Sequence, residues 1–103
     1  METLPDYLRE DTREWAQEIL TEFELGDHHI KILILACEAL DRISEAREVI
    51  AKEGAYYKDR FGKPKTHPAL AVEKDNKIIF ARLMRELCLD IEAPGDTGRP
   101  PGL

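Results

Sequence analysis

The stretch "DHHIKILILACEALDRISEAREVIAKEG", residues 27–54, decides the fold. Its apolar residues recur at helical spacing, which predicts one helix from about Asp27 to Glu53 with Gly54 as its stop. At about 1.5 Å per residue such a helix reaches ~40 Å. A compact chain of this size has a radius of gyration near ~13 Å. We therefore expect the helix to protrude or to be flanked by a partner.

Two apolar stripes follow this helix. One spans its full length and consists of Ile32, Leu35, Ala39, Ile43, Ala46 and Ile50. The other is confined to the first half and consists of Ile30, Leu33, Cys37 and Leu40. Because two apolar faces need two coverings, we expect a long helix against the first stripe. We expect a short helix against the second stripe, which also serves as an interface between subunits.

A shorter helix is predicted upstream, from about Thr12 to Glu24, with Trp15 on its apolar face. Asp11 and Glu14 have the spacing of a capping box, in which each side chain bonds a free backbone N–H of the first turn. Asp27 is expected to cap the long helix that follows. Residues 1–10 are expected to form a loosely docked arm.

A third helix is predicted from about Pro68 to Cys88. Proline suits the first helical position, and either Thr66 or His67 is expected to cap it. We expect His67 to cap this helix and to pack under the tip that precedes it, rather than to take part in a chemical reaction. Asn76 lies within the predicted core face and is interpreted as a polar residue that sets the helix register.

Between the long helices, residues 54–66 read "GAYYKDRFGKPKT", a basic and aromatic stretch. They predict a loop or a small two-stranded ribbon, kept short because Pro64 cannot donate to a ladder. The expected fold is all-α: a long antiparallel helical hairpin with a short N-terminal helix and this loop or ribbon at its tip. Residues 11–90 would form the helical domain, and residues 91–103 a flexible Pro/Gly-rich tail.

Charge is distributed unevenly along the 103 residues, which carry a net charge of −6. Residues 1–53 hold 6 Lys or Arg against 14 Asp or Glu, whereas residues 54–103 hold 9 against 7. The first half is therefore acidic and the second half keeps a local basic surface. No signal peptide or membrane-spanning stretch is apparent, so a cytoplasmic protein with reduced cysteines is expected.

Catalytic motifs do not emerge from the sequence: it has no glycine-rich phosphate loop, no nucleophile elbow and no HExxH motif. His28 and His29 are adjacent, so they point about 100° apart on a helix, and no further ligand completes a zinc site. We expect neither an enzyme nor a metal or other cofactor.

The order of these parts resembles the small subunit of phage terminases, in its short helical branch with a Gly…His-Pro core. The resemblance rests on an "L…W…I" first helix, "KEG", an aromatic and basic loop, "HPAL" and "LMRELCLD". Its anchor residues here are Trp15, Asp27, Gly54, Gly62, His67, Pro68, Leu83 and Leu87. In one departure, Cys88 stands where this family usually has a glycine at the end of the third helix.

This resemblance implies a non-catalytic, ring-forming protein of a tailed phage or prophage, acting in the host bacterial cytoplasm. Its implied partners are double-stranded viral DNA, the large ATPase and nuclease subunit, and further copies of itself. Two alternatives remain: a helical DNA-binding transcription regulator, and an oligomeric scaffold without a DNA role. The first is weakened because the long helix is about twice the length expected in a compact helix-turn-helix.

If the protein binds DNA, the basic second half is expected to make the contacts. The candidate residues are Lys58, Arg60, Lys63 and Lys65 at the tip, and Lys74, Arg82 and Arg85 on the third helix. Tyr56, Tyr57 and Phe61 are expected to hold the tip together rather than to stack on bases.

Overall fold

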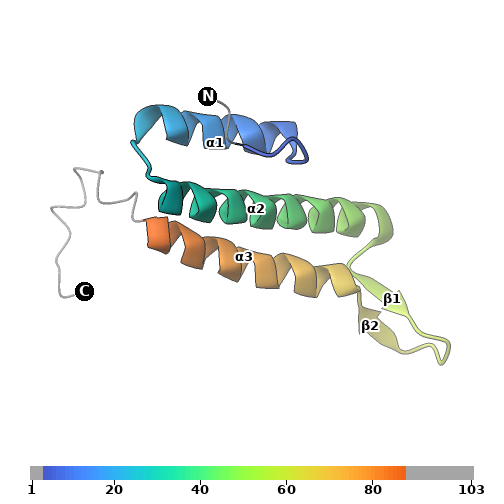
Figure 1. The fold of residues 1–103 in the computed structure, drawn as a ribbon. Helices are drawn as coiled ribbons and strands as arrows, with labels where there is room; N and C mark the ends of the chain where they lie inside the picture. The colour runs from blue at the N-terminus through green and yellow to red at the C-terminus, as the bar shows by residue number, and fades with distance from the viewer. Residues whose placement is uncertain (1–3, 88–103) are drawn as a thin grey trace, which may run out of the picture.

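A computed structural model describes residues 4–87 of the chain. Its elements in order are α1 (Glu10–Glu22), α2 (Asp27–Glu53), β1 (Tyr56–Lys58), β2 (Pro64–Thr66) and α3 (Pro68–Leu87) (Figure 1). The predicted fold is confirmed: α2 and α3 form a long antiparallel hairpin, and a two-stranded ribbon lies at its tip. The predicted end of the third helix at Cys88 and the predicted tail lie outside the described residues.

The hairpin is held together by small and branched apolar residues. Ala39, Ile43 and Ala46 of the full-length α2 stripe are all at most 5% exposed, and Ala69 of α3 is also buried. Small side chains let two helix backbones approach closely, which favours a long antiparallel contact. Leu35 departs from the stripe, because 51% of its surface is exposed.

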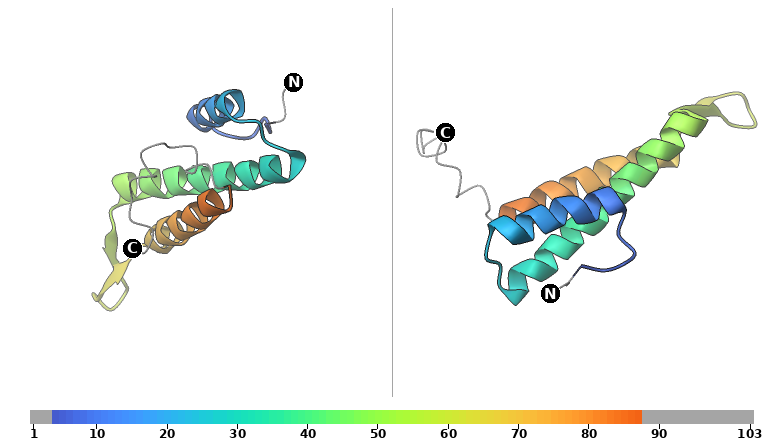
Figure 2. Two further views of the ribbon diagram at one scale, coloured as in Figure 1. Left: turned by 90° about the vertical axis from the view of Figure 1, so that its left-hand side faces the viewer. Right: turned by 90° about the horizontal axis from the view of Figure 1, so that it is seen from above.

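Helix α1 lies across the hairpin and covers the shorter α2 stripe (Figure 2). The cluster beneath it joins Ala16 and Ile19 of α1 to Leu33 and Cys37 of α2. Leu87 of α3 and Leu4 and Leu8 of the arm complete this cluster. Trp15 also contacts Phe80 of α3, with ring centroids 5.8 Å apart. The described part of the arm, residues 4–9, is thus packed into the core through Leu4 and Leu8, and for these residues the prediction of loose docking is wrong.

The predicted subunit interface needs the same correction in part. Leu33 and Cys37 are completely buried within one chain. They therefore have no surface left to offer a second copy. Burial, followed by the nearby Asp41 and Glu38 carboxylates, raises the pKa of the Cys37 thiol to about 12, so this cysteine stays protonated. Ile30 and Leu40 are half-buried, and their role between subunits stays a prediction.

Both predicted caps of the first two helices are wrong. Helix α1 begins at Glu10, so Asp11 lies inside its first turn, and the cap residue Arg9 makes no side-chain capping bond. The Asp11 carboxylate instead accepts a hydrogen bond from the Thr12 N–H at 2.8 Å. A cap at Asp27 would require α2 to start at residue 28, but α2 starts at Asp27. Gly26 is therefore at the cap position, and Asp27 lies in the first turn.

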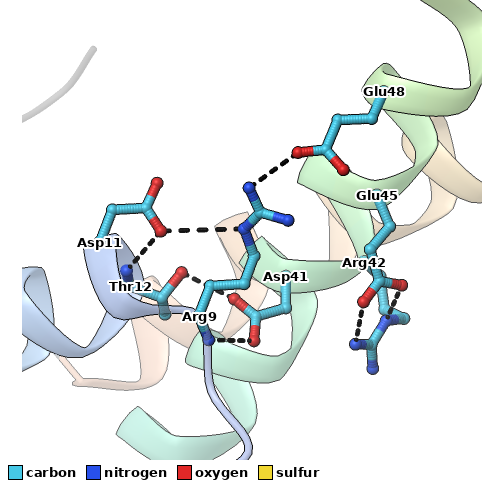
Figure 3. A network of polar contacts seen from close by, with 7 residues as sticks. All are labelled: Arg9, Asp11, Thr12, Asp41, Arg42, Glu45 and Glu48. Atoms are coloured by element: carbon cyan, nitrogen blue, oxygen red, sulfur yellow. Dashed lines mark hydrogen bonds and ion pairs between the residues drawn. The ribbon is translucent and has the colours of Figure 1, made fainter. Parts of the chain in front are cut away.

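The missing cap of α1 comes from another helix. Asp41 of α2 is only 2% exposed. Its Oδ2 accepts a hydrogen bond from the backbone N–H of Arg9 at 3.0 Å, and its Oδ1 accepts one from the Thr12 hydroxyl at 2.7 Å (Figure 3). A carboxylate at this end of a helix also interacts favourably with the helix dipole. Asp41 therefore fixes the start of α1 against the middle of α2.

Side chains of the arm extend this attachment. The Arg9 guanidinium donates to Glu48 of α2 at 2.8 Å, and Arg13 donates to the carbonyl oxygen of Pro5 at 2.6 Å. The Tyr7 hydroxyl donates to the Glu38 carboxylate, and this bond raises the pKa of Tyr7 above its ordinary value. The polar contacts of the arm thus tie it to α2 beside the cluster beneath α1.

The tip of the hairpin begins and ends with defined backbone signals. Gly54 follows α2 with φ of 90°, a conformation that side chains disfavour. His67 precedes α3, and its Nδ1 accepts the Ala69 N–H at 3.0 Å, so it is the expected cap. Its Nε2 lies 2.8 Å from the Glu53 carboxylate at the end of α2. The His67 ring therefore joins the two helix ends on either side of the ribbon.

Replacing Asp41 by alanine is expected to lower the free energy of unfolding by about 2–4 kcal/mol. The change leaves the Thr12 hydroxyl and the Arg9 N–H without their buried acceptor. Urea unfolding followed by circular dichroism measures this loss. Glu45→Ala is the control, because it removes a more exposed α2 carboxylate paired with Arg42 and should cost about 0.5 kcal/mol. Equal losses in the two variants would contradict the role of Asp41.

Replacing His67 by alanine is expected to reduce stability by about 1 kcal/mol, the usual cost of removing a helix cap. His67→Asn should recover most of this loss, since asparagine is among the preferred cap residues. Thermal unfolding of both variants checks the expectation. A His67→Ala protein that melts like wild type but has lost its function would instead point to a chemical role.

Candidate nucleic-acid interface

The ribbon positions its cations on both faces. Its antiparallel register pairs Tyr56 with Thr66, Tyr57 with Lys65, and Lys58 with Pro64. Because successive residues of a strand point to opposite faces, Lys65 shares a face with Tyr57, and Lys58 shares the other face with Pro64. The ribbon extends past the ends of α2 and α3 (Figure 1), so both of its faces are open.

Asp59 organises the turn between the two strands. Its Oδ1 accepts the backbone N–H groups of Phe61 at 2.8 Å and Lys63 at 2.9 Å. Its own N–H donates to the carbonyl oxygen of Lys63, and its carbonyl oxygen accepts the N–H of Gly62, both at 2.9 Å. Gly62 has φ of 79°, which a turn this tight requires. The hydrogen bonds of this one residue therefore define the turn.

The four predicted cations of the tip are Lys58, Arg60, Lys63 and Lys65, and all are exposed. Within residues 4–87, none of them forms an ion pair with a carboxylate. The Arg60 guanidinium lies over the Phe61 ring, 5.3 Å from its centroid. The one carboxylate of the ribbon, Asp59, is occupied by the backbone. The tip is therefore a local positive surface on an acidic chain.

The aromatic residues of the tip are not buried, and the prediction that they hold it together is wrong. Phe61 is 74% exposed, Tyr56 68% and Tyr57 48%. The hydrogen bonds of Asp59 hold the turn instead. The sequence did not indicate this role of Asp59. An aspartate in a turn-rich stretch looks the same in the sequence whether its carboxylate faces water or accepts backbone N–H groups.

The second predicted set lies on α3. Lys74, Arg82 and Arg85 are exposed, and their spacing places them on the side of α3 opposite Phe80. Arg85 lies 17 residues after Pro68, or about 26 Å along the helix, and α3 runs back from the ribbon (Figure 1). The structure therefore does not bring the tip and the far end of α3 into one cluster.

A nearby group of charges on the hairpin is internally paired. Glu73 of α3 accepts from Arg47 of α2 at 2.9 Å and lies 3.0 Å from Lys77. The bonds to Arg47 and then to Lys77 lower the pKa of Glu73 below its ordinary value. Arg47 and Lys77 are therefore partly neutralised, which separates them from the unpaired cations of the tip.

An open groove of about 310 Å³ lies between α2 and α3. It is lined by Leu35, Glu38, Ala39, Arg42, Asn76, Ile79 and Leu83. None of these residues belongs to the cluster beneath α1. Leu35 points about 160° away from Leu33 around α2, so the groove lies on a face that α1 leaves uncovered. Sequence reasoning placed Leu35 in the buried stripe and missed this groove.

Residues with metal-binding or catalytic potential are not assembled into a centre in the part of the chain that the structure describes. No group of three or more His, Cys, Asp or Glu residues there could hold a metal ion. The His28 and His29 rings pack edge to face, with ring centroids 5.2 Å apart. Among the same residues, no helix is long and apolar enough to cross a bilayer.

Comparisons with known proteins agree with the resemblance that the sequence motifs indicate. The family model described as phage terminase, small subunit, matches residues 13–100. This match covers α1 from Arg13 on, together with the hairpin and the ribbon. No curated protein and no solved structure matches the chain. Because the family model covers most of the sequence, the chain belongs to the phage terminase small-subunit family.

Proposed function

We propose that this protein is the small terminase subunit of a tailed-phage or prophage DNA-packaging motor, acting in the cytoplasm of the host bacterium. Its family is generally the non-catalytic terminase subunit and is associated with viral DNA and the large subunit. In this proposal it forms a ring, recognises viral DNA and regulates the large ATPase and nuclease subunit. No reaction is assigned to the chain itself.

The observation that carries the DNA-binding part is the unpaired positive charge of the ribbon. Four cations lie within residues 58–65, and the single carboxylate among them accepts two backbone N–H groups. Phosphate contacts depend on the local potential rather than on the net charge of −6. A ring would repeat this positive tip once per subunit. The cations of all subunits would then together form a positive surface around the ring.

The groove between α2 and α3 supports the self-association part. Leu35 and Ile79 leave 51% and 44% of their surfaces exposed there, beside the charged Glu38 and Arg42. Acidic and basic halves on one chain also offer complementary surfaces to a neighbouring copy. Contacts between two different surfaces of identical chains generate rings when the rotation closes. We therefore place the subunit interface at this groove, in addition to Ile30 and Leu40.

Replacing Ile79 by glutamate is expected to lower the mass of the assembly, because it places a charge in the groove. Ile78→Glu is a matched control: both side chains are 44% exposed on the same helix, but they point about 100° apart. Light scattering of the two variants measures the difference. If Ile79→Glu keeps the wild-type mass, the groove is not the interface. Leu33→Glu cannot serve here because Leu33 is buried within one chain.

Removing the tip cations is expected to weaken DNA binding. The triple change Lys58→Ala, Arg60→Ala and Lys63→Ala should reduce duplex affinity and lower the salt slope by about 1 for each phosphate that is no longer neutralised. A second triple, Lys74→Ala, Arg82→Ala and Arg85→Ala, removes the same charge from α3. Binding is measured by fluorescence anisotropy across salt, with the assembly mass checked. Wild-type affinity and slope in the first triple would exclude the tip.

A further inference from the structure

The side chain of Phe61 occupies an unusual position. It lies in the turn at the far end of the ribbon and, at 74%, is the most exposed large apolar side chain of residues 4–87. The ribbon extends away from the three helices (Figures 1 and 2), so no helix covers this ring, and Arg60 of the same turn lies over it. Tyr56 and Tyr57 of β1 are exposed in the same short segment, and exposed apolar side chains that are grouped together mark interaction sites.

The turn presents Phe61 rigidly. The backbone N–H of Phe61 donates to Asp59 Oδ1, and the N–H groups of Gly62 and Lys63 donate to oxygens of the same residue. These bonds fix the backbone on both sides of the ring. A group held in place before binding loses little conformational entropy when it inserts into a partner. The geometry is that of a prearranged apolar projection rather than of a collapsed turn.

The surroundings of the ring favour a polyanion as its partner. Arg60 stacks over Phe61 at 5.3 Å, and Lys63 follows two residues later. Lys58 and Lys65 continue the positive charge along the strands. Asp59 is the single carboxylate among these four cations, so it offsets only one of their charges. Duplex DNA is complementary to this arrangement. Its phosphates can contact the cations on either side of the ring, while the ring faces the stacked bases that the phosphates flank.

Direct reading of adenine is poorly provided for in the ribbon. Residues 55–66 contain no asparagine and no glutamine, the side chains that read adenine by paired hydrogen bonds. Apolar side chains such as phenylalanine can instead enter between base pairs from the minor groove and kink the duplex. Flexible pyrimidine–purine steps yield most easily to such a wedge.

We propose that Phe61 is a DNA wedge: its ring inserts between two base pairs from the minor groove, while Arg60 and Lys63 contact the adjacent phosphates. The duplex bends at each engaged tip, and sites with flexible steps are preferred because they cost less to deform. This proposal rests on the proposed DNA-binding function and adds the mode of contact to it.

The test uses the full-length protein and a duplex of about 30 base pairs, the length of a single bent site, with fluorophores at its two ends. Phe61→Ala is expected to weaken binding about tenfold, the scale of one aromatic–base interaction, and to abolish the bend seen by energy transfer. Phe61→Leu should retain both, because leucine also acts as a wedge. The salt slope should stay at the wild-type value in both variants, since no charge is removed.

Several outcomes would overturn the wedge. If Phe61→Ala binds and bends DNA like wild type while the triple change of Lys58, Arg60 and Lys63 weakens binding, the tip contacts DNA by charge alone. If Phe61→Ala retains DNA binding and bending but loses association with the large terminase subunit, Phe61 is a protein contact. If the wild-type protein binds no duplex at any salt concentration, the DNA-binding function itself fails. Ile78→Ala, a truncation of an exposed apolar side chain on α3 outside the groove, controls for general effects on assembly.

Discussion

The buried carboxylate of Asp41 is the contact on which the arrangement of the helices depends. Its two oxygens accept one backbone and one hydroxyl hydrogen bond from the start of α1. The cluster between α1 and the hairpin is apolar, and the hydrophobic effect that stabilises it is not directional. The Asp41 bonds do have direction. They set where along α2 the short helix starts and so which α2 residues it covers.

That placement determines which faces stay open. Helix α1 covers Leu33 and Cys37, and with Trp15 it reaches Phe80 on α3. The opposite side of the hairpin keeps the groove around Leu35 and Ile79. Within a single chain, one apolar face of the hairpin is therefore buried by α1. The other face stays exposed and can contact a second copy of the chain. At the far end, the contact between His67 and Glu53 fixes how the ribbon leaves the helices.

Much of this fold could be predicted from local patterns, because helical periodicity and backbone signals act over short distances. The α2 stripe, the Gly54 stop and the His67 cap all follow from neighbouring residues. Asp41 was missed because its charge alone does not distinguish it from the other acidic residues of α2. One signal was available: Leu33, Cys37 and Asp41 are spaced four apart, so the aspartate continues a buried stripe.

The parts that could not be predicted depend on contacts between distant segments. Nothing near Leu35 in the sequence indicates that α3 leaves about half of this side chain exposed. The exposure of Phe61 likewise follows from the bonds of Asp59 to the turn, which are a property of geometry rather than of composition. Candidate DNA contacts could be chosen by charge, but only the folded chain shows that the tip and the far end of α3 do not form one cluster.

The proline of β2 has a consequence for the behaviour of the protein at high concentration. A projecting two-stranded ribbon has two open edges, and open edges invite strands of other molecules to pair with them. Pro64 lies in one edge strand and has no N–H to offer. Lys58 and Lys65 add like charges that repel a second ribbon. The same short segment that reaches outward is thus protected against edge-to-edge aggregation, even where many copies stand side by side.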